Sequence, residues 1–452
     1  MSWSNIHASL FTDFSQALEN TGIRYFVLRN YETLPLHNPS KDIDIIIEPG
    51  KYKIAVKFLN ALYLKYGFNY PYVLEFEKVH CVYAANTTAH HSIHIDLIEG
   101  YRHKGFELFT FDEFYDHTKM FNGFRVLDDD YDTTLLLYYK LFAAKHLITR
   151  YRDRILSGFQ KSPSTIHQLL VKLSGDALGN QVFESLSEGK FEDIEKLTRK
   201  LSVTTKRRAF FRRPIRTSCN VLFFLTQQFK KIVICPKRFR KFFVVLGPDG
   251  VGKSTFIDLL EKEINYYYVA NGDKCIIYHH RPSKLPNLGA VGEQVHLMKE
   301  DKDFTNPHRT KPAGFFSSLI RMSYYFADYF LFMPFIVRRN AKWDYFVVFD
   351  RYIYDFLIDP FRSRINLPYL IRRFFASLVI EPRIVFVLYA DSETIYQRKQ
   401  ELSKEELQRQ LKLYRELAST STRFVLLDAT QTPEQLVAQA MTRLLECFSS
   451  RV

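Results

Sequence analysis

The chain has 452 residues, 46% of them hydrophobic and 25% charged, which is an ordinary composition for a globular protein of about two or three domains. The net charge is +14, and residues 201–241 hold twelve Lys or Arg and no Asp or Glu. This uneven distribution favours one local anionic partner and argues against a specific nucleic-acid partner bound over the whole surface. The five cysteines (Cys81, Cys219, Cys235, Cys275 and Cys447) include no C-x-x-C pair, which argues against a disulfide framework or a zinc site and favours a reducing cytoplasm.

The first residues, MSWSNIHASLFTDF, lack a basic region followed by an apolar core, so we expect no signal peptide. Residues 1–130 are predicted to form an α/β unit, with a helix in SLFTDFSQALENTG and strands in IRYFVLRN, KDIDIII and SIHIDLI. Asp42 and Asp44 lie two residues apart, so both carboxylates project from one face of their strand while the neighbouring isoleucines pack on the other. In the same way, the Asp96 side chain projects from the face of its strand that is opposite to the apolar face.

Two carboxylates on one strand and a third on a neighbouring strand can bind metal ions for nucleotidyl transfer. On the residues LRNYETLP, KDIDIII and HIDLI, about the first 155 residues resemble the minimal nucleotidyltransferase superfamily, in an uncharacterised bacterial branch. The resemblance implies Mg²⁺ ligation by Asp42, Asp44 and Asp96. The family usually has Gly-Ser before the D-x-D pair, where this chain has Leu28, Arg29 and Asn30, so a retained fold without nucleotidyl transfer is an open alternative.

Residues 131–200 are predicted to form a helical subdomain, because apolar residues recur there at three-and-four spacing. Residues 201–241 are predicted to be a basic amphipathic linker with a helix near 215–229. Phenylalanine and leucine beside arginine suit a helix lying on an anionic membrane surface. The alternative is an interdomain helix whose arginines pair with one of the two flanking domains.

The stretch FFVVLGPDGVGKST combines an apolar strand, a glycine-rich turn and the start of a helix. It fits G-x-x-x-x-G-K-[ST], in which backbone amides and a helix N-terminus hold phosphate oxygens. We expect Lys253 to reach the β- and γ-phosphates of ATP, and the Ser254 hydroxyl to hold Mg²⁺. The predicted nucleotide-binding residues are Gly247, Asp249, Gly250, Val251, Gly252, Lys253, Ser254 and Thr255.

Residues 242–452 alternate between strands and helices, which predicts a five-stranded parallel sheet with helices on both faces. The expected strands are FFVVLG, KCIIYHH, YFVVFD, RIVFVLY and FVLLD, while the apolar stretch Ser317–Arg339 is expected to be a packed helix. Asp350 and Arg351 follow the third strand, where an aspartate suits Mg²⁺ and an arginine suits an acceptor phosphate.

On GPDGVGKST, the D-R-Y at Asp350–Tyr352 and the segment YADSETIYQRKQELSKEELQRQLKLYREL, this domain resembles thymidylate kinase and related nucleoside monophosphate kinases. The resemblance implies a helix and lid in that last segment. It also implies a catalytic arginine from the lid, with Arg398 the first candidate and then Arg409 or Arg415. Asp249 matches the family's contact to a sugar hydroxyl, and dimerisation is common in the family.

The acceptor site departs from the thymidylate kinase pattern. HHRPS has Arg281 but no glutamate of the family's R-E-P, and YYFADYFLF offers Asp328 where the family usually has an arginine. Residues of DFLIDPFRSR, namely Asp355, Asp359, Arg362 and Arg364, either line a rebuilt acceptor site or form a salt-bridged helix start.

Three functions remain open on the sequence. The first is an ATP- and Mg²⁺-dependent kinase acting on a thymidylate-like nucleoside monophosphate or a related phosphorylated or hydroxylated small molecule. The second is a nucleotidyltransferase that modifies a sugar or protein through Asp42, Asp44 and Asp96. The third is a membrane-associated ATPase switch. For all three we expect a cytoplasmic protein, with peripheral attachment to the inner face of the membrane and a homodimer as further expectations.

Overall fold

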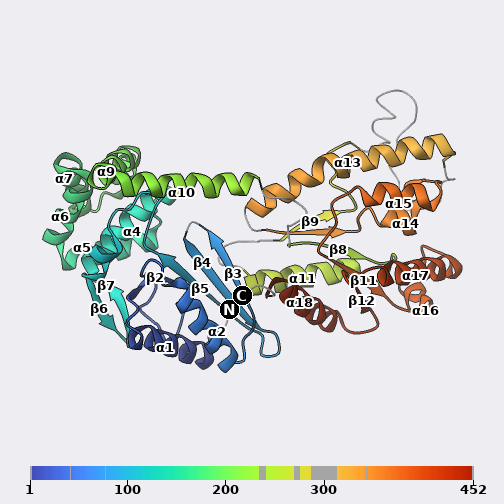
Figure 1. Ribbon diagram of the computed structural model, residues 1–452, viewed down its shortest axis with the longest axis horizontal. Helices are drawn as coiled ribbons and strands as arrows, with labels where there is room; N and C mark the ends of the chain where they lie inside the picture. The colour runs from blue at the N-terminus through green and yellow to red at the C-terminus, as the bar shows by residue number, and fades with distance from the viewer. Residues whose placement is uncertain are drawn as a thin grey trace. The chain divides into compact units, whose positions relative to one another are not determined.

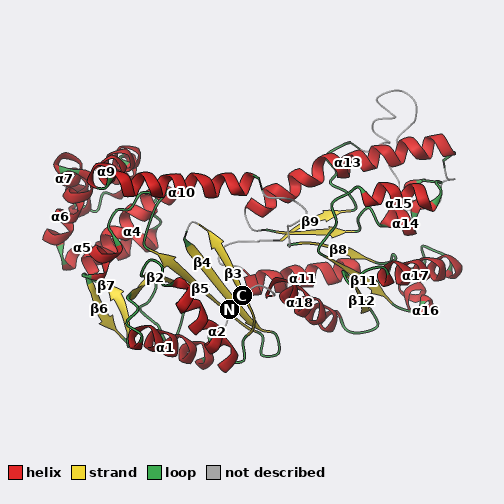
Figure 2. Ribbon diagram, viewed as in Figure 1, coloured by secondary structure: helices red, strands yellow, loops and turns green. Residues whose placement is uncertain are grey.

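The computed structural model describes residues 3–40, 42–76, 78–233, 241–268, 275–286, 313–342 and 345–449. The chain divides into two compact units, Met1–Phe229 and Lys230–Ser450, and each contains its own β-sheet (Figures 1 and 2). Among the described helices, none combines the length and apolar character needed to cross a bilayer. The predicted α/β class is confirmed for both units.

The first unit begins with an α/β core and continues into a helical region (Figure 1). Its elements are α1 (Asn5–Asn20), β1 (Tyr25–Leu28), β2 (Ile43–Ile47), α2 (Tyr52–Lys65), β3 (Asn69–Phe76), β4 (Val79–Asn86), β5 (His91–Glu99), α3 (Phe111–Tyr115), β6 (Thr118–Phe121), β7 (Phe124–Leu127), α4 (Asp129–Ala144), α5 (Thr149–Lys161), α6 (Pro163–Ser174), α7 (Asp176–Ser187), α8 (Phe191–Lys196), α9 (Thr198–Arg212) and α10 (Pro214–Ile232).

The seven strands of the first unit form one mixed sheet in the order β3-β4-β5-β2-β1-β7-β6. Strand alternation decides which side chains reach which face. Ile43, Ile45 and Ile95 enter the core between the sheet and helices α1 and α2, whereas Ile46 enters a second core with α4 and the later helices. The predicted opposition of the aspartates to the apolar faces of β2 and β5 is therefore correct.

The helical subdomain predicted for residues 131–200 corresponds to α4–α8 and the start of α9. The predicted linker 201–241 is helical through Ile232, and the compact first unit extends to Phe229. Two arginines of its basic segment pair with glutamates of the first unit: Arg213 contacts Glu113 at 2.7 Å, and Arg216 contacts Glu107 at 2.8 Å. Residues 234–240 lie outside the described part of the chain.

The second unit is an alternating α/β fold. Its elements are β8 (Phe242–Leu246), α11 (Lys253–Tyr268), β9 (Cys275–His279), α13 (Phe315–Lys342), β10 (Phe346–Asp350), α14 (Asp355–Ile358), the 3₁₀ helix η3 (Pro360–Ser363), α15 (Tyr369–Ser377), β11 (Ile384–Tyr389), α16 (Ser392–Arg398), α17 (Lys404–Ser419), β12 (Phe424–Asp428) and α18 (Pro433–Ser449).

The five strands of this unit are all parallel, in the order β12-β11-β8-β10-β9 (Figure 2). Residues of α13, α15 and α17 form one core with the Val244 face of β8, and α11 packs on the other face, where Phe256 meets Phe386 of β11. The predicted parallel sheet with helices on both faces is confirmed. Because β8 lies between β10 and β11, the loops that follow these strands meet at one edge of the sheet.

Candidate active sites

The loop between β8 and α11 has the backbone geometry that a phosphate-binding loop requires. Gly250 has φ +84° and Gly252 has φ +103°, values that side-chain-bearing residues rarely adopt. A Cβ on Gly250 would lie 2.8 Å from the Cβ of Lys399, so the loop also packs too closely for a larger residue there. Helix α11 starts at Lys253, and its exposed residues Ser254 and Thr255 lie in the first turn.

Lys253 lies in the loop rather than extending into solvent. Its ammonium group donates to the carbonyls of Gly247 at 2.9 Å and Pro248 at 2.8 Å, and its side chain is 7% exposed. Burial lowers the pKa of Lys253 to about 8, and the nearby Arg351 adds to this effect, whereas Asp249 opposes it. The loop therefore holds a cation that lacks enough negative charge around it.

Asp249 is the carboxylate on which the cations of this site converge. It forms ion pairs with Arg351 and Arg362, and its Oδ1 atom lies 3.7 Å from Lys253 Nζ. Burial alone would raise the pKa of Asp249, but Arg351, Lys253 and Arg362 outweigh burial and lower it. One carboxylate thus partly neutralises three cations beside the loop.

Asp350 and Arg351 occupy the predicted position at the end of β10, where Asp350 is paired with Val245 of β8. Arg351 has φ +70° and donates to Asp355 at 3.1 Å in addition to its contact with Asp249. The Oδ2 atom of Asp350 lies 3.4 Å from His279, while its buried Oδ1 atom has no hydrogen-bond partner within the described ranges. A buried carboxylate oxygen without a hydrogen-bond donor is suited to bind a cation.

Two of the three candidate catalytic arginines contact main-chain carbonyls outside the phosphate loop, and the third lies over an aromatic ring. Arg398, at the end of α16, donates to the Ala429 carbonyl at 3.2 Å. Arg409 of α17 donates to the Ile358 carbonyl at 2.9 Å and pairs with Glu406. Arg415 lies over the ring of Tyr389 at 5.5 Å. A role for Arg398 or Arg409 in catalysis therefore stays a prediction.

Asp328 of α13, considered above as part of the acceptor site, instead holds the segment after β9. It is fully buried, pairs with Arg281 at 2.9 Å, and accepts backbone N–H groups of Ser283, Lys284 and Leu285. With four donors, this carboxylate fixes the chain that carries Arg281. Arg281 also lies over the ring of Tyr325, which stacks on Phe356 with centroids 5.6 Å apart.

In the first unit the three predicted aspartates come together. Parallel pairing of β2 and β5 places Asp44 beside Asp96, and ligand oxygens of Asp42, Asp44 and Asp96 lie within 4.8 Å of one another. These distances fit a metal-binding cluster built from carboxylate oxygens.

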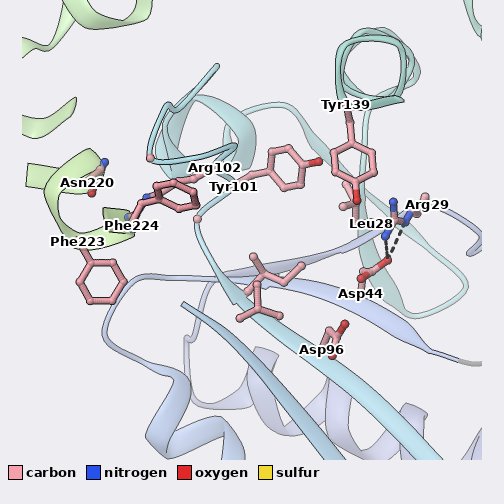
Figure 3. Close-up of a pocket in the computed structure, with 14 residues that line it drawn as sticks. Leu28, Arg29, Asp44, Asp96, Tyr101, Arg102, Tyr139, Asn220, Phe223 and Phe224 are labelled. Carbon is pink, nitrogen blue, oxygen red and sulfur yellow. Dashed lines mark hydrogen bonds and ion pairs between the residues drawn. The ribbon is translucent and has the colours of Figure 1, made fainter. Parts of the chain in front are cut away.

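Arg29 also lies in this cluster, which the sequence did not predict. It follows β1 with φ +42°, and its guanidinium group contacts Asp44 Oδ2 at 2.7 Å (Figure 3). Burial raises the pKa of Asp44 to about 6, although Arg29 opposes the shift. Burial would also raise the pKa of Asp96, but His94 outweighs it and the pKa is lowered. Arg29 thus supplies a positive charge beside the three aspartates.

A cavity of about 240 Å³ opens beside this cluster. Asp44 and Asp96 form part of its wall, together with Tyr101, Tyr139 and residues of α10 such as Phe223 (Figure 3). Tyr101 and Tyr139 could not be predicted from the sequence, because neither belongs to a motif. The cavity is large enough for a small ligand and presents both carboxylates and aromatic rings to it.

No family model matches the sequence, and no curated protein matches it. Among solved structures, the chain is similar to a thymidylate kinase from Ehrlichia chaffeensis, with 15% sequence identity and a TM-score of 0.31. The match covers 45% of this chain and 97% of that kinase. A similarity at this level assigns no activity, so the chemistry has to be argued from the side chains.

Proposed function

We propose that the second unit is an ATP-dependent kinase. It transfers the γ-phosphoryl group either to a thymidylate-like nucleoside monophosphate or to a related phosphorylated or hydroxylated small molecule. The observation that carries the proposal is the convergence of Lys253, Arg351 and Arg362 on one carboxylate beside a glycine loop. Phosphoryl transfer depends on positioning and charge neutralisation, and these groups provide both.

The charge balance of the loop supports a phosphate ligand. Lys253 is buried with its pKa lowered to about 8, which means that its surroundings disfavour the ammonium form. Phosphate oxygens in the loop would replace the carbonyl contacts of Lys253 and favour its charged form. A bound polyanion should therefore stabilise the charged form of Lys253 more than it would stabilise that of a solvent-exposed lysine.

Mg²⁺ fits the residues at this edge of the sheet. Ser254 and Asp350 would hold it, the latter through an oxygen that has no hydrogen-bond partner in the part of the chain that the structure describes. When bound, Mg²⁺ neutralises charge on the phosphates. Arg351 would hold the acceptor phosphate, and Arg398, or failing that Arg409, would neutralise charge on the transferring group.

The acceptor side of the site suits a molecule with a flat ring and a phosphate. Arg351 and Arg362 supply charge for a phosphate. Phe356 is a core residue, so of the stacked pair Tyr325 and Phe356 only the partly buried Tyr325 ring, over which Arg281 lies, can contact the ring of an acceptor. A nucleoside monophosphate is therefore the first acceptor class to test.

The test is transfer of label from γ-labelled ATP to a panel of nucleoside monophosphates, phosphosugars and nucleosides. Lys253→Ala should abolish transfer while circular dichroism stays unchanged, since the side chain serves ligand binding. Lys262→Ala, an exposed lysine on the same helix α11, is the matched control and should retain activity. Unchanged kcat in Lys253→Ala, or no labelled product from any acceptor, would overturn the proposal.

Nucleotidyl transfer by the first unit is the second candidate, favoured by the approach of Asp42, Asp44 and Asp96 to within 4.8 Å beside a cavity. The same panel with α-labelled ATP, over sugars and proteins, tests it. Label from the α-phosphate that disappears in Asp44→Asn would support this activity. Free phosphate alone, with no acceptor labelled, would point to an ATPase switch.

Binding of the basic segment 201–241 to an anionic membrane is a separate proposal. Helix α10 has exposed apolar residues, including Ile215 and Leu222, and carries one arginine, Arg216, in its first turn. Sedimentation with phosphatidylserine vesicles, before and after Ile215→Ser and Leu222→Ser, tests it. Equal sedimentation with neutral vesicles would contradict it.

A further inference from the structure

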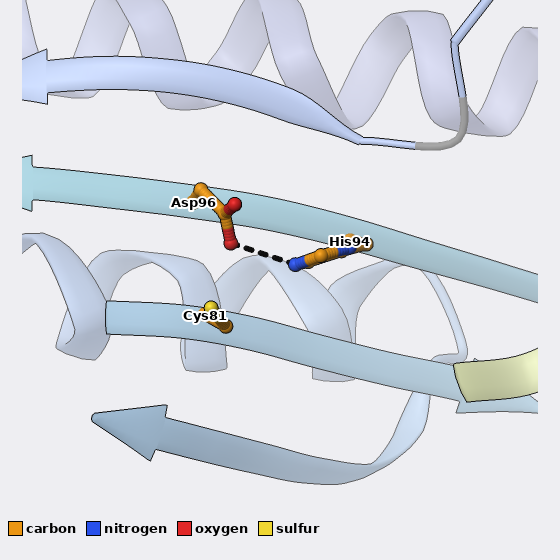
Figure 4. Close-up of side chains that lie close together, drawn as sticks. All are labelled: Cys81, His94 and Asp96. Carbon is orange, nitrogen blue, oxygen red and sulfur yellow. Dashed lines mark hydrogen bonds and ion pairs between the residues drawn. The ribbon is translucent and has the colours of Figure 1, made fainter. Parts of the chain in front are cut away.

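A second group of metal-ligand side chains lies next to the aspartate cluster. Antiparallel pairing of β4 and β5 places Cys81 directly opposite Asp96, and His94 lies two residues before Asp96 on the same face of β5 (Figure 4). One ligand atom from each of the three residues lies within 4.8 Å of the other two. The residues are separated in sequence, and only the register of the two strands brings them together.

These side chains are held in place before any ligand binds. His94 is 3% exposed, and its ring stacks on Tyr83 with centroids 4.0 Å apart and planes 20° apart. Its Nε2 atom lies 2.7 Å from Asp96 Oδ1, and the Cys81 thiol also interacts with the Asp96 carboxylate. The imidazole and the thiol therefore both contact the Asp96 carboxylate already.

The spacing fits a tetrahedral ion after small side-chain movements. With bonds of about 2.0–2.3 Å, ligand atoms in a tetrahedron lie roughly 3.5 Å apart. The 2.7 Å contact between His94 Nε2 and Asp96 Oδ1 has to open by about one ångström, and the three ligand atoms already lie within 4.8 Å of one another.

The donor types select one class of cation. Mg²⁺ and Ca²⁺ prefer oxygen ligands alone, whereas thiolate and imidazole together suit Zn²⁺ and related transition metals. The oxygen-only cluster already contains the Arg29 guanidinium group on Asp44. That positive charge disfavours a further cation among the three aspartates, whereas the donor types of Cys81 and His94 favour a transition-metal ion beside Asp96.

We propose that Cys81, His94 and Asp96 bind one Zn²⁺-type divalent cation in the first unit. Three protein ligands leave one tetrahedral position, the arrangement of zinc sites that hold water or a ligand rather than purely structural ones. Asp96 also lines the cavity of about 240 Å³, so an oxygen-bearing ligand in that cavity can reach the ion. This site is independent of the kinase proposed for the second unit.

The test uses the full chain after treatment with a chelator, titrated with Co²⁺ and then with Zn²⁺. Co²⁺ should give tetrahedral d–d bands and a thiolate charge-transfer band, at one ion per chain, and Zn²⁺ should displace it. Cys81→Ser should abolish the charge-transfer band and weaken binding by at least about tenfold, since even outer-shell partners of a metal commonly contribute that much. Cys219→Ser, at an exposed cysteine of α10, is the matched control and should change neither.

Asp42→Asn separates the two clusters, because Asp42 belongs only to the oxygen cluster. It should leave the thiolate band unchanged. A second measurement needs no variant: Zn²⁺ should slow alkylation of Cys81 by iodoacetamide, mapped by mass spectrometry, while Cys219 reacts at the same rate with and without the ion. Absence of a thiolate band in the wild-type chain, its persistence in Cys81→Ser, or equal alkylation of Cys81 with and without Zn²⁺ would overturn the proposal.

Discussion

Replacement of Asp249 by asparagine removes the carboxylate that lies beside all three cations of the phosphate loop site, Lys253, Arg351 and Arg362, while keeping the side chain's shape. At 3.7 Å and an effective dielectric constant of about 20, the attraction between Asp249 and Lys253 alone is about 4.5 kcal/mol before desolvation is considered. Breaking a buried ion pair typically destabilises a protein by about 3–5 kcal/mol. Arg351 keeps Asp355 as a partner and Arg362 is 27% exposed, so we expect the lower end, about 3 kcal/mol.

A polyanion should reverse much of this loss, because its oxygens can take the place of the missing carboxylate. We expect tripolyphosphate to stabilise Asp249→Asn more than the wild type. The assay is urea unfolding with linear extrapolation. Unfolding is monitored by tryptophan fluorescence. The chain has two tryptophans, Trp3 and Trp343, and a Trp3→Phe background leaves Trp343 as the single fluorophore of this type.

Glu416→Gln is the control for the Asp249 experiment. It removes an exposed carboxylate of α17 that lies 4.0 Å from Lys412, and it should change the free energy of unfolding by less than about 0.5 kcal/mol. A loss below about 1 kcal/mol in Asp249→Asn, or equal stabilisation of both proteins by tripolyphosphate, would refute the charge balance described above.

Two further predictions concern the phosphate loop and His280, which directly follows β9. Gly250→Ala should destabilise the second unit by more than about 1 kcal/mol and should weaken ATP binding more than Gly252→Ala does. Both glycines have positive φ, but only a Cβ at position 250 meets Lys399. Urea unfolding and calorimetry measure the two effects, and equal effects in the two variants would contradict the prediction. Burial lowers the pKa of His280 from 6.5 to about 4, so this imidazole is protonated at a lower pH in the folded state than in the unfolded state. Stability should therefore be fully present above pH 6.5 and fall by up to about 3 kcal/mol as the pH drops towards 4. His280→Asn, which tolerates the φ of +60° at this position, should flatten that part of the unfolding profile, and an unchanged slope would show that other groups cause it.

The parts of the fold that follow local patterns could be predicted from the sequence. All five strands of the second unit are apolar runs bounded by turns, and β2 and β5 alternate clearly enough to place Asp44 and Asp96 on one face of the sheet. The phosphate loop was found because its motif includes the strand before it and the helix after it.

Features set by contacts between distant residues could not be predicted. The role of Asp328 depends on the chain after β9 folding back onto α13, and no local pattern encodes that contact. From the sequence, Arg29 is only a departure from Gly-Ser. Its pairing with Asp44 could not be predicted, because it requires a left-handed turn after β1. The proximity of Cys81 to Asp96 depends on the register of β4 and β5, and a search for C-x-x-C spacing does not detect such a group.

Calorimetric titration of Mg·ATP tests whether the loop after β8 binds ATP through Lys253. The wild type and Lys262→Ala should bind one nucleotide per chain with similar affinity, and Lys253→Ala should show no binding heat under the same conditions. No heat with the wild-type chain, or the same Kd in Lys253→Ala, would contradict the claim.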